Sequence, residues 1–365
     1  MRILNYVSIL LLWSSGSYVF GATFPQPFVK VSAEYSKIEE SEVLTNLPKR
    51  RCQGEVPGAC VGAAGAFLVD HYNCRINKTK DCASLSQDEE VSALNVLTYG
   101  RTNLGAEDRS KLPSSFKSLG FKGVGGAQTL QNAANFFKFK AESCFPLDKI
   151  NNKHMTPNLS AVDLSKKIQA SIANLQTVYS ANKGKNETEA CEACILKGLE
   201  EAFGINPSTD GLRAAMQKET FEEFVYKVLF DDGKCKELNI KPKPFVAFFP
   251  RNESEQGNVK FTDAIDKAKE VLHDDKPILL SEICTVRKAD GQCIPESLHG
   301  LVVSGYKKVC KPNEPTKCRR VLRIENSWCG DWQKGFGDEA WVDAESLMAN
   351  IDSNPLNVGV LSWLR

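Results

Sequence analysis

Three short segments, far apart in the chain, hold the residue types needed for nucleophilic catalysis. They are Q-G-E-V-P-G-A-C (Gln53–Cys60), L-H-G-L-V-V-S-G-Y (Leu298–Tyr306) and R-I-E-N-S-W-C-G-D-W-Q-K-G-F-G (Arg323–Gly337). In chain order they supply an amide, a thiol, an imidazole and a second amide. This combination is typical of acyl transfer through a thiol.

Cys60 is the candidate nucleophile. A free thiol has a pKa of about 8.5 and needs help to become a thiolate at neutral pH. The segment V-G-A-A-G-A-F-L-V-D-H-Y-N (Val61–Asn73) is small, apolar and free of proline, which predicts a buried helix beginning just after Cys60. The partial positive charge at a helix N-terminus favours the thiolate.

The other three side chains have complementary roles. His299 is the candidate general base and acid, and Asn326 would orient its ring without adding charge. Gln53 lies close upstream of the thiol and can donate an N–H to the oxyanion formed on a scissile carbonyl. Of the four histidines, only His299 combines an apolar strand with a downstream Asn-Ser-Trp; a buried structural histidine is the alternative.

The chain contains 13 cysteines, an odd number. An exported chain with many cysteines predicts a disulfide framework, and an odd count leaves at least one thiol outside it. Cys60 is the natural residue to leave unpaired, because the helix follows it directly. Local spacing suggests three bridges, although spacing alone does not fix connectivity: Cys74 with Cys82, Cys284 with Cys293, and Cys310 with Cys318.

Cys191 and Cys194 form a C-x-x-C. Such a pair can be a redox centre or half of a zinc site, but no second C-x-x-C or histidine pair accompanies it. We therefore favour a structural disulfide and expect neither a metal nor another cofactor.

The remaining pattern predicts the elements that must position these residues. Residues 1–21 resemble a cleaved signal peptide, because Arg2 precedes the short apolar run Ile3–Trp13. Residues 22–50 contain three prolines and predict an extended segment. We expect an N-terminal helical lobe at 51–143, a helical insertion at 144–243 and a β-rich lobe at 244–365, which together make an α+β fold.

Two details of this pattern concern helix ends. Ser86 and Glu89 form a capping box that predicts a helix continuing through Val91–Leu97. In the insertion, amphipathic periodicity predicts one helix through 164–178, a second at about 189–203 and a third at 212–230.

The charge balance excludes some classes of function. Lys plus Arg (46) nearly equal Asp plus Glu (45) in the 365 residues, so no global field attracts nucleic acid or an anionic membrane. No segment is long and apolar enough to predict a membrane span. We expect a secreted or periplasmic monomer whose partner is a protein or peptide substrate.

The order Gln, Cys, His, Asn, the H-G-L-V-V-S-G-Y segment and the E-N-S-W…W…G-F-G run resemble the papain-like cysteine peptidases. The resemblance implies that Trp328 shields the histidine–amide hydrogen bond and that Gly125, Gly126 and Trp328 bind substrate. It also implies a two-lobed fold, with a helical N-terminal half, a barrel-like antiparallel sheet in the C-terminal half and the active cleft between them.

The chain departs from the family pattern near the thiol. Val61 replaces the usual aromatic residue, the Gln53-to-Cys60 spacing is one residue longer, and Cys329 follows the Asn-Ser-Trp tripeptide where the family has glycine. Three functions stay open: peptide-bond hydrolysis through a thioester, peptide or protein binding by a catalytically inactive relative, and another acyl transfer such as transamidation.

Overall fold

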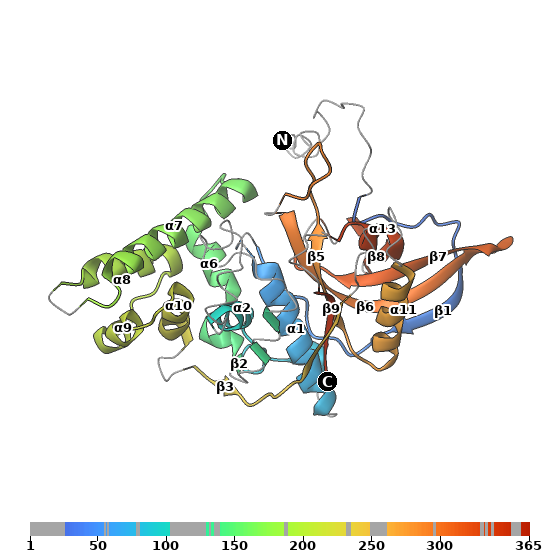
Figure 1. Ribbon diagram of the computed structural model, residues 1–365. Helices are drawn as coiled ribbons and strands as arrows, with labels where there is room; N and C mark the ends of the chain where they lie inside the picture. Colours follow the sequence, from blue (N-terminus) through green and yellow to red (C-terminus); the bar gives the residue numbers. More distant parts are fainter. Residues whose placement is uncertain are drawn as a thin grey trace, which may run out of the picture.

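The computed structural model describes residues 26–54, 56, 58–77, 81–102, 129–130, 133–134, 139–185, 189–230, 235–248, 261–294, 297–328, 332, 335–336, 339–351 and 359–365. The predicted signal peptide and the predicted substrate-binding residues Gly125 and Gly126 lie outside these ranges. The described chain combines helices with antiparallel sheet, so the predicted mixture of helix and antiparallel strand is confirmed (Figure 1).

Helix α1 (Ala59–Ile76) is the buried centre of the molecule and confirms the helix predicted after Cys60. It is rich in small residues because a second helix, α2 (Ala93–Thr102), crosses it closely. A Cβ atom added at Gly62 would lie 2.4 Å from the backbone oxygen of Ala93. Only glycine allows this approach, so the small-residue pattern sets how deeply the helix is buried.

Only half of the capping box predicted at Ser86 forms, because the Glu89 N–H donates to the Ser86 backbone carbonyl and not to its hydroxyl, and the helix expected to begin there is wrong. The backbone N–H of Ser86 donates to Glu89 Oε2 at 3.2 Å, closing a turn. Val91 then forms an isolated β-bridge with Ala141, which extends the backbone. Helix α2 begins only after Ser92, whose hydroxyl accepts the Asn95 N–H at 3.2 Å. Tertiary pairing at Val91 therefore overrides the local signal.

The region predicted as an insertion is helical and folds back on α2. Its elements are α6 (Leu147–His154), α7 (Ala161–Asn182), α8 (Glu192–Phe203), α9 (Thr209–Met216) and α10 (Phe221–Phe230). The single helix predicted at 212–230 is two helices, because Thr220 and Glu223 form a second capping box, with each backbone N–H donating to the other residue's side chain.

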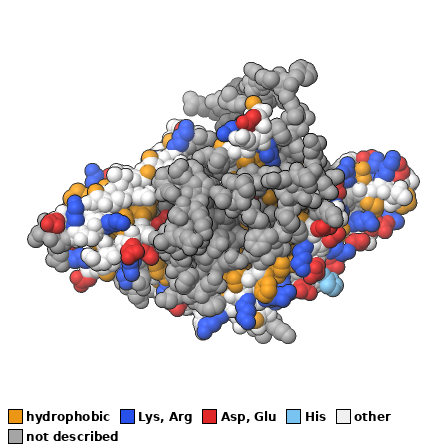
Figure 2. All heavy atoms as spheres, in the orientation of Figure 1, with side chains coloured by type: hydrophobic (Ala, Val, Ile, Leu, Met, Phe, Trp, Pro, Cys, Tyr) orange, Lys and Arg blue, Asp and Glu red, His pale blue; other side chains and the backbone are white. Residues whose placement is uncertain are grey.

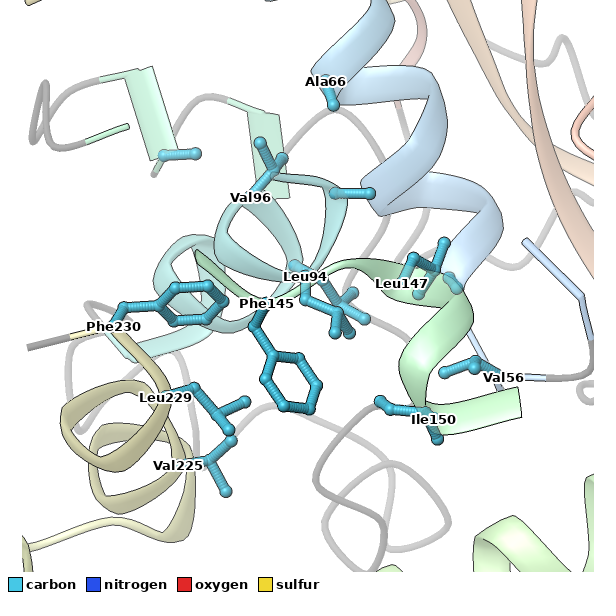
Figure 3. Packing of buried hydrophobic residues seen from close by; sticks show 14 of the residues in the cluster. Val56, Ala66, Leu94, Val96, Phe145, Leu147, Ile150, Val225, Leu229 and Phe230 are labelled. Atoms are coloured by element: carbon cyan, nitrogen blue, oxygen red, sulfur yellow. The ribbon is translucent and has the colours of Figure 1, made fainter. Parts of the chain in front are cut away.

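Both ends of this helical region are tied together. Strand β2 (Phe139–Lys140) pairs with β3 (Glu237–Leu238) in a separate two-stranded sheet. Figure 3 shows the packing that holds the region in place, with Val225, Leu229 and Phe230 of α10 near Phe145, and the contacts between α10 and α2 agree with this view. The helices of the region thus share one hydrophobic cluster with α1 and α2.

The larger sheet has seven strands among the described residues. Its order is β4-β9-β5-β6-β7-β8, with β1 pairing the far half of β6. The bounds are β1 Lys37–Val43, β4 Pro244–Phe248, β5 Ile278–Cys284, β6 Leu298–Lys311, β7 Glu314–Glu325, β8 Trp341–Asp343 and β9 Gly359–Leu364. No pairing between β4 and β8 closes it in the described chain, so the predicted barrel-like form is corrected to an open sheet. The segment 22–50, predicted as extended, contributes β1.

The sheet is covered on two sides. Helices α11 (Phe261–His273) and α13 (Ala344–Ala349) pack on one face around a second hydrophobic cluster. Helix α1 contacts β5, β6 and β9, and Leu279, Val302 and Leu364 of the sheet join the first cluster. Figure 1 shows α1 between the insertion helices and the sheet. The helix that carries Cys60 therefore lies against the strand that carries His299.

Disulfides join the pairs Cys74–Cys82, Cys284–Cys293 and Cys310–Cys318, confirming the three local bridges, and also Cys191–Cys194. No helix in the described ranges is long and apolar enough to cross a membrane. Basic and acidic side chains are interspersed over the described atoms of the face in Figure 2.

Candidate active site

Cys60 is the second residue of α1 and is not disulfide-bonded. The N-cap of this helix is Gly58, whose φ of 72° lies in the left-handed region that favours glycine, and no side chain caps the helix. Cys60 is 6% exposed, and α1 packs on β6, whose Gly300 N–H lowers the pKa of the thiol against the effect of burial. The predicted nucleophile thus sits at a helix N-terminus beside the residue that follows His299.

His299 is held by Asn326 at the adjacent strand end. In the pairing of strands β6 and β7, Val302 lies opposite Glu325. Asn326 therefore follows directly after the last paired residue of β7. The His299 Nε2 and Asn326 Oδ1 atoms lie 2.7 Å apart, and both residues are buried. The hairpin register brings together two residues that are 27 positions apart in the sequence.

The direction of this hydrogen bond assigns the tautomer of His299. The backbone N–H of Trp328 donates to the same Oδ1 of Asn326, at 3.3 Å, which identifies that atom as the acceptor oxygen. Nε2 of His299 therefore donates, and Nδ1 is the basic nitrogen of the neutral ring. A ring fixed in this way can take a proton only at Nδ1.

Trp328 covers the imidazole. Its ring stacks on His299 with a centroid distance of 4.4 Å and an interplanar angle of 30°. Extending the register from the pair Val302 and Glu325 by three residues places Trp328 opposite His299. Trp328 is 38% exposed, so one side covers the histidine while the rest is open to solvent.

Burial decides the charge states of Cys60 and His299 at neutral pH. It lowers the pKa of His299 to about 4, against the opposing effect of the hydrogen bond to Asn326. Burial also raises the pKa of the Cys60 thiol, although the Gly300 N–H favours the thiolate. At neutral pH the resting pair is a neutral thiol and a neutral imidazole.

Glu282 is a site residue that the sequence reasoning missed. It lies in β5, is 8% exposed, and its carboxylate raises the pKa of the Cys60 thiol further. Its φ of 63° is in the left-handed region, at a bulge in the β5–β6 pairing next to the pair Ile283 and His299. Such strain clusters at functional sites, and a bulge re-aims a side chain. The available signal was a charged residue inside the apolar run Ile278–Cys284.

Gln53 is fixed to the segment that follows Asn326. The hydroxyl of Ser327 donates to Gln53 Oε1 at 2.5 Å, and the Gln53 backbone N–H donates to the Ser327 carbonyl at 2.9 Å. Because its oxygen is engaged, the side-chain amide presents its N–H groups as donors. Asn326, Ser327 and Trp328 thus each contact a predicted site residue. Ser327, which the sequence analysis named only as part of the motif, is the residue that holds Gln53 by these two hydrogen bonds.

The segment before Gln53 is held by buried charge. Arg51 Nη2 lies 2.5 Å from Asp70 Oδ2 of α1, and Arg51 Nη1 lies 3.2 Å from Glu142 Oε2. Glu142 in turn accepts the N–H groups of Ala93 and Leu147. This network joins the Gln53 segment to α1, α2 and the start of the helical region, which fixes the amide relative to the thiol.

Comparison with known proteins gives limited similarity. No model of a protein family matches the chain, and no curated protein matches it. A crystal structure of SERA5E from Plasmodium falciparum superimposes with a TM-score of 0.34 and 12% identity over 94% of this chain and 96% of that one. A high-resolution structure of SERA5E gives 0.36 and 13%, over 88% and 90% of the two chains. The SERA5 proenzyme from the same organism gives 0.36 and 12%, over 87% and 59%. Similarity at this level assigns no family, so the chemistry is inferred from the site residues themselves.

Proposed function

We propose that the chain is a papain-like cysteine peptidase that hydrolyses peptide bonds through a thioester intermediate. The observation that carries this proposal is the His299–Asn326 hydrogen bond beneath Trp328, on the strand whose Gly300 N–H favours the Cys60 thiolate. A thiol at a helix N-terminus and an oriented, neutral imidazole on the strand packed against that helix are the groups that thiol acyl transfer requires.

Each step of the reaction has a group to perform it. Nδ1 of His299 accepts the thiol proton as the sulfur of Cys60 attacks the substrate carbonyl. The side-chain N–H of Gln53 and the free N–H groups at the start of α1 stabilise the oxyanion. The imidazolium then protonates the departing amine, leaving a thioester. Water, deprotonated by His299, attacks the thioester to release the acid and restore the thiol.

The test combines labelling with peptidase assays. The folded protein is treated with a thiol-reactive epoxide, and labelled peptides are mapped by mass spectrometry. We expect the label on Cys60, and hydrolysis of a mixed peptide library that Cys60→Ala abolishes. Asn326→Ala is the variant matched to Cys60→Ala, because it changes the site but keeps the Cys60 thiol. Hydrolysis that survives Cys60→Ala, or a label absent from Cys60, would contradict the proposal.

A second candidate function is peptide binding without catalysis. The raised pKa of the buried Cys60 thiol beside Glu282 favours it, because this charge opposes thiolate formation. In that case the wild-type protein and Cys60→Ala would bind the same peptides with equal affinity, and neither would cleave them. Cleavage by the wild-type protein alone excludes this alternative.

We also propose that the protein works outside the reducing cytosol. The four disulfides in the described chain fit an oxidising compartment. N-terminal sequencing of protein recovered from the medium or periplasm of an expressing cell tests this. We expect the mature chain to begin near Ala22, whereas intact protein retained in the cytosol would contradict export.

A further inference from the structure

The Cys191–Cys194 disulfide differs from the other bridges by its exposure. Both cysteines are exposed, and they stand at the N-terminus of α8, whose 12 residues begin at Glu192. By contrast, Cys284, Cys293 and Cys310 are buried in the β-rich part of the molecule. Thiol–disulfide exchange requires in-line access of a thiolate to a sulfur atom, and this bridge offers that access.

The local geometry favours one thiolate once the bridge opens. Cys191 is the N-cap of α8, and its sulfur accepts the backbone N–H of Cys194 at 3.3 Å. The free N–H groups of a first helical turn lower the pKa of a thiol placed there. The nearby carboxylate of Glu192 has the opposite effect on the thiol, but it is held 2.8 Å from Arg213 Nε, which offsets its charge.

The fold does not depend on this bridge. It closes a loop with a sequence separation of three, so it constrains the unfolded chain less than the bridges with separations of eight or nine. The segment has other anchors: the Cys191 N–H donates to Asn182 Oδ1 at 2.9 Å, and Ile195 and Leu199 are fully buried. Opening the bridge leaves these contacts in place.

We propose that Cys191 and Cys194 form a redox-active pair that exchanges electrons with an external dithiol. The dithiol thiolate attacks Sγ of Cys194, the Cys191–Cys194 bond breaks, and its electron pair leaves on Cys191 as the stabilised thiolate. The second thiolate of the dithiol then attacks the dithiol sulfur of the mixed disulfide. This displaces Cys194 as a thiolate, which takes a proton from water. The dithiol is oxidised and the protein pair is reduced, independently of the chemistry at Cys60.

The test is a redox titration of the full chain with dithiothreitol as the dithiol. Samples equilibrated at graded ratios of reduced to oxidised dithiothreitol are acid-quenched and alkylated, and each cysteine peptide is quantified by mass spectrometry. We expect half-reduction of Cys191–Cys194 at a ratio at least ~10-fold lower than for Cys310–Cys318, with an unchanged circular dichroism spectrum. Equal ratios, or reduction only together with unfolding, would overturn the proposal.

Single-cysteine variants, which cannot form the bridge, test which of the two sulfurs is the better leaving group. In Cys194→Ser, the alkylation rate of Cys191 should reach half its maximum below the ordinary thiol pKa of about 8.5. In Cys191→Ser, alkylation of Cys194 is the matched comparison and should require a higher pH. Circular dichroism checks that both variants are folded. If Cys191 has the higher midpoint, the proposed leaving group is wrong.

Discussion

At the scale of single residues, the site balances groups that oppose one another at the thiol. The helix N-terminus and the Gly300 N–H favour the Cys60 thiolate, whereas burial and the Glu282 carboxylate oppose it. Glu282 also occupies a left-handed backbone conformation, which costs a non-glycine residue roughly 1–3 kcal/mol. We therefore expect the Glu282 charge to affect the reactivity of Cys60.

Glu282→Gln should make Cys60 more reactive at lower pH. The change removes the negative charge that raises the pKa of the thiol and keeps the side-chain shape, so that pKa should fall. The pH dependence of iodoacetamide alkylation at Cys60 measures it. Glu314→Gln, in the exposed β6–β7 hairpin, is the control and should leave the profile unchanged. A midpoint that does not move in Glu282→Gln would contradict the charge effect.

Trp328→Ala should raise the pKa of His299. Burial is the main cause of its lowered value of about 4, and the stacked indole supplies part of that burial. Opening the ring to water should move the pKa toward the ordinary value of about 6.5. Titration of the His299 ring signals by NMR measures this. Trp332→Ala is the matched control, because the Trp332 ring contacts the Trp328 ring. An equal shift of the His299 pKa in Trp332→Ala would contradict direct shielding by Trp328.

At the scale of elements, the sequence predicted what depends on local pattern. The helix after Cys60, the strands bearing His299 and Asn326, and the three short-range disulfides follow from periodicity and spacing. The Ser86 helix failed because Val91 pairs with Ala141, a contact 50 residues away. Glu282 was missed because its place near the thiol depends on a bulge in the pairing with the partner strand.

The site requires helix α1 to pack closely on strand β6. A Cβ atom at Gly300 would lie 3.3 Å from Val61 Cγ2, close enough to push the two elements apart by a few tenths of an ångström. Gly300→Ala should therefore lower kcat/KM by about 10-fold with little loss of stability, because catalysis tolerates misplacement poorly. Peptide hydrolysis and thermal unfolding measure the two effects.

The matched control removes the obstructing methyl groups. Val61→Ala/Gly300→Ala should recover most of the activity lost by Gly300→Ala, since the new Cβ then has room. Val61→Ala alone defines the baseline for the double-mutant cycle. If the double variant is as impaired as Gly300→Ala, the loss has a cause other than the packing of α1 on β6.

At the scale of the whole molecule, two buried histidines couple stability to pH. His71, inside α1, and His299, on β6, lie on elements that join the two hydrophobic clusters. Burial lowers the pKa of each to about 4. Such a histidine stays neutral when folded but is protonated near pH 6.5 when unfolded. The unfolded state therefore binds more protons between pH 6.5 and 4, and stability falls as the pH falls through this window.

Each histidine should contribute up to roughly 3 kcal/mol to the free energy of unfolding above pH 6.5, all of it lost below pH 4. His299→Gln and His71→Gln should each make that free energy less dependent on pH in this window, as measured by urea unfolding at pH 7, 5.5 and 4. His273→Gln, at an exposed site, is the matched control and should follow the wild type. If the free energy of unfolding of His299→Gln falls between pH 7 and pH 4 by as much as that of the wild type, the fold does not hold His299 neutral. The neutral thiol–imidazole pair on which the proposed proton transfer depends would then be wrong as well.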